Sequence, residues 1–387
     1  MKLLHQVWHN WKWNLDSFFE NKIWDWFIFT AYSIDEKKIW TSISWYSFDK
    51  IINNSLLDLQ YYGGKSSNGG KFCTYDFHPI HSNITMVDSI DSIMDWVKYQ
   101  IKKGFTNIII PHAYYNSLDT QKIISIIKSV NNHLIREKVS WVKYFMTLPI
   151  SNDVISNKDF IDELLFAVTD KDIAFDWYYV VCESKPWTRK KISDNFLYYN
   201  NLYRILNTLK TQQFEIVYAY ANFDAIVFYS LINIDYISIG TYENLRNFNI
   251  KTYTQDTSWW PSEWWYFSEK LLNMIKAQIL IMIRTKWCLE YIKNENNIFS
   301  DEILSEQYQW NTHKPQVHKN YLLAINNIFK KLSTYENLEE RKMHLIEKIE
   351  GARRVYKSLE EQWVYLMDES WDYFLGMWLS FLKSVKL

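Results

Sequence analysis

Short runs of apolar residues alternate along the first 295 residues with longer segments of helical periodicity. Each run is rich in Ile, Val, Phe or Tyr and has the length of a buried strand. Such alternation is typical of βαβ units on a parallel sheet. The predicted strands are Phe27–Tyr32, Leu56–Tyr62, Asn107–Pro111, Val142–Leu148, Phe175–Cys182, Glu215–Tyr220, Tyr236–Gly240 and Lys251–Thr254.

The segments between these runs read as amphipathic helices. Ser89 offers an N-cap and Gly104 a C-cap to the helix predicted over Ser89–Lys103. The other predicted helices are Asp119–Asn132, Lys158–Val168, Ser193–Gln212, Asn222–Ile232 and Trp265–Ile283. Eight strands with intervening helices predict an α/β fold, a (β/α)8 TIM-like barrel. A doubly wound open sheet is the alternative, because the pattern specifies the type of each strand better than the number of strands.

The alternation stops near residue 295, and residues 296–387 read as helices only. Glu336–Gln362 carries Leu345, Ile349 and Tyr356 on one side and charged residues on the other. We expect two parts, a barrel over 1–295 and a helical extension over 296–387. The extension either packs on the barrel or forms a homodimer interface.

Composition adds an anomaly in two residue types. The chain of 387 residues has 20 Trp and 8 Gly, where average usage predicts roughly 27 glycines. The codon UGA is a stop in the standard code, tryptophan in some bacterial codes and glycine in others. The excess of Trp therefore suggests that many tryptophans are UGA-encoded glycines.

The positions of the tryptophans fit this hypothesis. Trp24 and Trp141 precede predicted strands, Trp177 stands just before the apolar run Tyr178–Val181, and Trp363 stands where a helix should end. Such places favour glycine. The alternative is a protein truly rich in Trp, with a carbohydrate-binding or membrane-binding surface. The candidates for genuine tryptophan are Trp13 and Trp265.

Charge and cysteine content limit the partners and the compartment. The formal net charge is −1, which does not favour binding to nucleic acid. Three widely spaced cysteines and an N-terminus without an apolar signal core indicate a reducing, cytoplasmic location. No stretch approaches the length and apolarity of a membrane span.

In a barrel enzyme the chemistry lies at the C-terminal ends of the strands. Glu183 and Glu243 follow two predicted strands and are a candidate pair of carboxylates for acid/base work. The further catalytic candidates are His112, Lys185 and Asp256. Each of these residues is alternatively a solvated loop charge or a helix cap.

Polar residues beside them are predicted to bind substrate. The second predicted strand carries Asp58 as well as Gln60. Read with glycines, Ser258–Trp265 becomes a Gly-rich loop before a helix, a common phosphate site in barrels. The predicted binding residues are Tyr32, Gln60, Tyr114, Asn222, Asp224, Arg246, Ser258 and Ser262.

The sequence predicts no metal site, because the histidines are scattered and no Cys-x-x-Cys pair occurs. It identifies no cofactor. We expect a barrel enzyme, a hydrolase or lyase, that applies carboxylate acid/base chemistry to a small glycosyl or phosphorylated ligand. The alternative is a barrel protein that binds a partner without turnover.

Overall fold

The computed structural model describes most of the chain. The described ranges are 1–8, 11–44, 48–66, 70–75, 89–114, 120–170, 172–184, 191–242, 245–254, 264–310 and 315–387.

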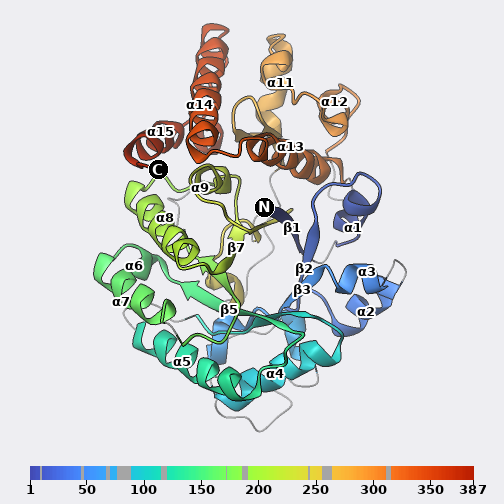
Figure 1. Ribbon diagram of the computed structural model, residues 1–387. Helices are drawn as coiled ribbons and strands as arrows, with labels where there is room; N and C mark the ends of the chain where they lie inside the picture. The colour runs from blue at the N-terminus through green and yellow to red at the C-terminus, as the bar shows by residue number, and fades with distance from the viewer. Residues whose placement is uncertain are drawn as a thin grey trace.

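Eight parallel strands form a nearly closed barrel with helices around it (Figure 1). The strands follow the order β3-β2-β1-β8-β7-β6-β5-β4, and the two end strands, β3 and β4, lie against each other. The predicted TIM-like barrel is thus confirmed, and the open sheet is excluded because the two end strands of the sheet, β3 and β4, meet. The strands are β1 (Lys2–Val7), β2 (Trp26–Thr30), β3 (Ser55–Asp58), β4 (Asn107–Ile110), β5 (Lys143–Ile150), β6 (Trp177–Cys182), β7 (Glu215–Ala221) and β8 (Tyr236–Gly240).

Two of the strand assignments made from sequence need correction. The first strand is β1, which the sequence analysis missed because His5 and Gln6 interrupt its apolar pattern. Both side chains are fully buried and hydrogen-bonded. Lys251–Thr254, predicted as the eighth strand, is a short helix, α10. Its tyrosine and threonines have high β-propensity. The segment has only four residues, however, and β-propensity is a weak preference that tertiary contacts override.

Helices alternate with the strands on the outside of the barrel, as the periodicity predicts. The Ser89 hydroxyl accepts from the Ser92 N–H and caps α4, and Gly104 follows that helix with φ +92°. The helices around the barrel are α1 (Lys12–Phe19), α2 (Glu36–Ser44), α3 (Phe48–Ile52), α4 (Ile90–Lys102), α5 (Thr120–Glu137), α6 (Asn152–Ile155), α7 (Lys158–Val168), α8 (Phe196–Thr211) and α9 (Ala225–Leu231), with 3-10 turns η1 (Tyr61–Ser66) and η2 (Gly70–Thr74).

The C-terminal part packs on one side of the barrel, at the top of Figure 1. Trp265–Ile283, predicted as one helix, begins instead with an antiparallel hairpin of β9 (Trp265–Ser268) and β10 (Asn273–Lys276). Only its second half is helical. Helix α14 contacts α9, and α15 contacts α8. The boundary near residue 295 stays a prediction. The remaining elements are α11 (Ala277–Thr285), η5 (Leu289–Tyr291), α12 (Ile298–Leu304), α13 (Gln316–Ser333), α14 (Leu338–Glu361), η6 (Asp368–Ser370) and α15 (Leu375–Ser384).

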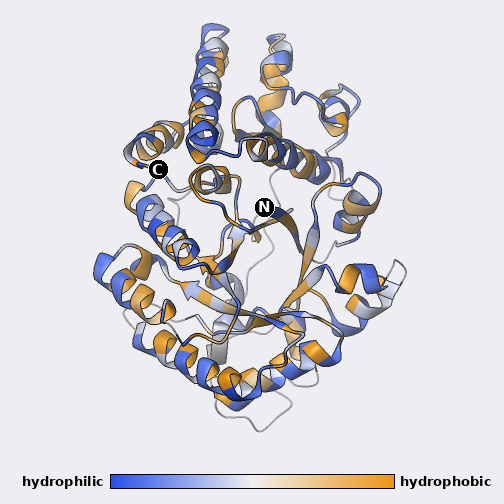
Figure 2. Ribbon diagram, viewed as in Figure 1, coloured by the Kyte–Doolittle hydropathy of each residue, from blue (hydrophilic) through white to orange (hydrophobic). Residues whose placement is uncertain are grey.

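Buried apolar side chains form two clusters, one inside the barrel and one between strands and helices. Figure 2 shows hydrophobic and hydrophilic residues mixed along the surrounding helices, as expected of helices with one apolar face. Leu4, Ile28 and Leu56 belong to the inner cluster, with Tyr179 and Val217 from the opposite wall. Side chains alternate along a strand, so residues two positions beyond an inner residue also face the interior. No helix in the described part of the chain has the length and apolar character needed to cross a membrane.

The buried His5 predicts a pH-dependent stability. Its Nε2 donates to the Ile23 carbonyl at 3.0 Å and its Nδ1 accepts from Asn14, so the ring is neutral. Burial lowers the pKa of His5 from 6.5 to about 3. Between these values the unfolded chain binds the extra proton and the folded chain does not, so stability falls as the pH drops from 6.5 towards 3.

We expect a loss of up to about 1.4 kcal/mol per pH unit in this window, measured by urea unfolding. His5→Gln keeps a donor for Ile23 but does not titrate, and it should remove this part of the pH dependence. The pKa of Asp224, raised to about 6, acts in the opposite direction in both proteins and cancels in the comparison. Equal pH profiles for the two proteins would contradict the prediction.

Candidate functional site

A buried carboxylate stands at the C-terminal end of β3, inside the barrel. Asp58 is 3% exposed. Its Oδ2 accepts hydrogen bonds from the hydroxyls of Tyr62 at 2.9 Å, Tyr179 at 3.0 Å and Tyr220 at 2.9 Å. These tyrosines come from η1, β6 and β7, so the closure of the barrel assembles the cluster. We call Asp58 with these three tyrosines the tyrosine cage.

A second layer of polar groups supports the cage. The Gln60 backbone N–H donates to Asp58 Oδ1 at 2.8 Å, and Gln60 Nε2 donates to the hydroxyls of Tyr220 and Tyr253. Gln60 and Tyr220 both have left-handed backbones, with φ of 55° and 54°. Tyr220 lies where the β7–β8 register shifts. Strained non-glycine backbones and bulges occur often at functional sites, and here two such residues touch one carboxylate.

Burial and hydrogen bonds act on Asp58 in opposite directions. Burial raises the pKa of Asp58, and the hydrogen bonds from the Gln60 N–H and the tyrosine hydroxyls lower it in part. The net pKa lies above the ordinary value of 3.8. A buried carboxyl group whose pKa is raised is a candidate for accepting and returning a proton. Burial also raises the pKa values of the three cage tyrosines, so their hydroxyls stay protonated as donors.

A second buried carboxylate, Glu183, follows β6 at the same end of the barrel. The Tyr114 hydroxyl donates to Glu183 Oε2 at 2.6 Å. Tyr114 in turn donates its backbone N–H to the Tyr62 carbonyl at 2.9 Å, which ties it to the cage. The ring of Phe248 packs against both Tyr62 and Tyr114. The two carboxylates are therefore linked through one aromatic cluster, since Tyr62 bonds to Asp58 and Tyr114 to Glu183.

The structure brings several predicted site residues to this cluster. Glu183, Gln60 and Tyr114 belong to it directly. Tyr32 packs edge-on against Tyr253 and donates to the Thr252 carbonyl.

His112, a catalytic candidate, is buried after β4. Its Nδ1 lies 2.6 Å from the Ala113 carbonyl, and because that oxygen can only accept, Nδ1 carries the proton.

Three other predicted binding residues lie elsewhere. Asp224 accepts from the Tyr199 hydroxyl among the helix-facing side chains, outside the barrel interior. Asn222 Oδ1 is 3.4 Å from the Tyr321 hydroxyl of α13, and the Arg246 guanidinium stacks on the same ring at 4.0 Å. Arg246 also donates to the carbonyls of Gly240 and Thr241. Asn222 and Arg246 thus link the barrel to the C-terminal helices.

The remaining candidates fall outside the described residues, and so does most of the predicted phosphate loop at Ser258–Trp265. These candidates are Lys185, Glu243, Asp256, Ser258 and Ser262.

Sequence reasoning gave no role to the residues that form the cage. Asp58 carries the one available signal, a carboxylate at the end of an otherwise apolar strand. The cage tyrosines Tyr62, Tyr179 and Tyr220 are three of 28 tyrosines, and in the linear sequence nothing separates them from tyrosines of the outer core.

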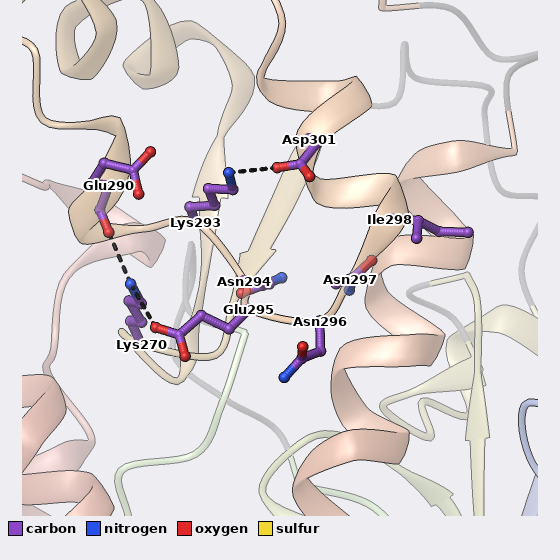
Figure 3. Close-up of a pocket in the computed structure, with 9 residues that line it drawn as sticks. All are labelled: Lys270, Glu290, Lys293, Asn294, Glu295, Asn296, Asn297, Ile298 and Asp301. Carbon is purple, nitrogen blue, oxygen red and sulfur yellow. Dashed lines mark hydrogen bonds and ion pairs between the residues drawn. The ribbon is translucent and has the colours of Figure 1, made fainter.

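A depression of about 700 Å³ lies away from the barrel, in the C-terminal part (Figure 3). Four of its charged groups form two pairs. Lys270 lies 3.2 Å from Glu295, and Lys293 lies 2.8 Å from Asp301. Both carboxylates are mostly exposed, and exposed pairs of this kind contribute little binding or stability. The depression is therefore a weaker candidate than the tyrosine cage.

Within the described residues, no group of three His, Cys, Asp or Glu side chains is placed to hold a metal ion. No protein family matches the sequence, and no curated protein shows significant similarity to it. Fold and site together define the class: a TIM-like (β/α)8 barrel with C-terminal helices and a tyrosine-caged carboxylate at the C-terminal end of its strands.

Proposed function

We propose that this protein is a barrel enzyme that cleaves a small, neutral glycosyl substrate by carboxylate acid/base chemistry. The observation that carries the proposal is the tyrosine cage. Burying a carboxylate is unfavourable unless hydrogen bonds compensate for lost water. Here three tyrosines and a strained Gln60 surround a single Asp58 at the end of the barrel where such enzymes do their chemistry.

Asp58 is the proposed general acid/base. Its raised pKa fits proton transfer to or from a sugar oxygen. Glu183 is the proposed second carboxylate, held by the Tyr114 hydroxyl. Two carboxyl groups flanking one bond are the usual requirement for glycoside hydrolysis. The pair predicted from sequence, Glu183 with Glu243, is replaced in this proposal by Glu183 with Asp58, because Glu243 lies outside the described residues.

Charge favours a neutral ligand over a phosphorylated one. In the described structure, Asp58 is held by uncharged donors, the tyrosine hydroxyls and the Gln60 N–H. A phosphate placed beside this carboxylate would be repelled. Aromatic rings line the same region, and the apolar C–H faces of sugars pack well on such rings.

Two glutamines supply further groups for sugar hydroxyls. Gln60 Oε1 and Gln6 Nε2 are buried and have no hydrogen-bond partner in the described part of the chain. Gln6 follows Leu4 by two positions on β1, so it faces the barrel interior as Leu4 does. An unsatisfied buried amide atom costs about 1–3 kcal/mol. A hydroxyl both donates and accepts, and can satisfy either atom.

The test is a panel of 4-nitrophenyl glycosides of neutral hexoses and pentoses, with 4-nitrophenyl phosphate beside them. We expect release of nitrophenol from at least one glycoside and none from the phosphate. Release from the phosphate alone would overturn the choice of a neutral substrate. If no compound is cleaved while a sugar raises the melting temperature, the barrel is a binding protein without turnover. If no sugar is cleaved or bound, the proposal fails altogether.

A further inference from the structure

We propose that Trp287 and Trp363 are glycines in the natural protein, each encoded by UGA. This inference concerns the identity of the chain and does not depend on the proposed function. It rests on backbone conformation, hydrogen bonding and exposure at the ends of two helices. It identifies two of the tryptophans that contribute to the excess of Trp over Gly.

Trp287 ends α11 in a left-handed conformation, with φ of 57°. Its N–H donates to the Arg284 carbonyl at 2.9 Å, and the next N–H, of Cys288, donates to the Ile283 carbonyl at 2.9 Å. These two bonds define a Schellman motif, and the residue between them occupies the C′ position that usually belongs to glycine. The indole itself is 92% exposed.

Trp363 ends α14 with the same geometry. Its φ is 61°. Its N–H donates to the Glu360 carbonyl at 2.9 Å, and the Val364 N–H donates to the Leu359 carbonyl at 2.9 Å. The side chain is 70% exposed. The β-carbon of a residue other than glycine is unfavourable in this conformation, and here little burial of the ring offsets the cost.

The same chain provides a glycine in the same motif. Gly104 ends α4 with φ of 92°, and the N–H groups of Gly104 and Phe105 make the equivalent bonds to Ile101 and Gln100. Gln213 ends α8 in the same way, with φ of 67°. The four helix ends thus share one backbone geometry, with glycine at one, glutamine at one and tryptophan at two.

Tryptophan is over-represented in this conformation. Ten non-glycine residues of the described structure have positive φ, and three of them are tryptophans, although Trp supplies only 20 of 387 residues. The third, Trp24, is left out of the proposal. Its ring is buried and its Nε1 donates to the Leu322 carbonyl. The backbone conformation therefore favours glycine at this position, whereas the packed side chain favours tryptophan.

Trp378 shows what a genuine tryptophan looks like in this protein. It lies within α15, is 0% exposed, and its Nε1 donates to the Tyr199 hydroxyl at 2.9 Å. Its backbone is helical and its ring fills the core. We therefore expect a UGG codon at Trp378 and UGA codons at Trp287 and Trp363.

The direct test is peptide mass spectrometry of the protein isolated from its source cells, together with the codons of its gene. The expected result is peptides with the mass of glycine at positions 287 and 363, and with the mass of tryptophan at position 378. Tryptophan at 287 and 363 in the native peptides, or UGG codons there, would overturn the proposal. Glycine at all three positions would overturn the structural criterion that separates them.

A second test uses recombinant protein with the printed sequence. Trp287→Gly and Trp363→Gly should each raise the midpoint of thermal unfolding, by about 1–3 °C. Gln213→Gly is the matched control, because it relieves the same conformation at a residue that is not tryptophan, and should give a similar rise. A fall for both tryptophan variants, with a rise for Gln213→Gly, would show that the indoles are favourable there and would contradict the proposal.

Discussion

Replacing Asp58 by asparagine is expected to lower kcat on a cleaved glycoside by about 10²–10⁴-fold. Asparagine keeps the shape of the side chain and accepts hydrogen bonds through its oxygen, but it cannot take up or return the proton. Because the three tyrosines keep a partner, the fold should survive the change. The measurement is steady-state kinetics on the substrate found in the glycoside panel, with circular dichroism to verify folding.

Asp224→Asn is the control for loss of a buried carboxylate. Asp224 is as buried as Asp58, and burial raises its pKa to about 6, but it bonds to Tyr199 outside the barrel interior. This variant should retain turnover close to that of the wild type. If Asp58→Asn keeps full activity, Asp58 is a structural group and the proposed mechanism is wrong. If both variants lose activity equally, the loss follows from removing any buried carboxylate and is no evidence for proton transfer by Asp58.

Truncating Trp378 to alanine is expected to destabilise the protein by about 3–5 kcal/mol. The ring is fully buried against Phe223 and Phe374, and its N–H holds the Tyr199 hydroxyl. Removal leaves a cavity and takes a partner from Tyr199, which itself donates to Asp224. The measurement is the free energy of unfolding from urea titration.

Trp378→Phe separates the two contributions, since it keeps most of the apolar volume and removes only the donor. We expect it to cost less than half as much as the alanine variant. The contrast with Trp287 is the stronger check. Trp287→Gly removes an exposed indole from a left-handed position and should stabilise the protein by up to about 1–2 kcal/mol. Trp378→Ala removes a buried indole and should destabilise the protein. Effects of the same sign at both positions would contradict this reading of the two environments.

Strand and helix types were largely readable from the sequence, because they depend on local patterns. Seven of the eight predicted strands overlap barrel strands, as β2 to β8 show. Lys158–Val168 is predicted with the bounds it has in the structure. The errors fall where local pattern and tertiary partners disagree. β1 contains buried polar residues that only its neighbours satisfy, and Lys251–Thr254 is too short for propensity to decide.

The candidate site was readable only in part. The rule that chemistry lies at strand ends led to Glu183, Gln60 and Tyr114, which do meet in space. It also led to Asn222, Asp224 and Arg246, whose side chains face the helices. A strand end specifies which end of the barrel a residue occupies. It does not specify whether the side chain turns inward, since a bulge such as the one at Tyr220 changes that direction.

The linear order of residues was enough to establish the alternating α/β pattern, the helical C-terminal part and the unusual balance of tryptophan and glycine. These are properties of composition and of contacts within a few residues. The tertiary structure alone decided that Asp58 is the caged carboxylate, because its three tyrosine donors lie 4, 121 and 162 positions away along the chain. It also decided which tryptophans stand in glycine positions, because a left-handed backbone and an exposed ring are properties of the folded chain.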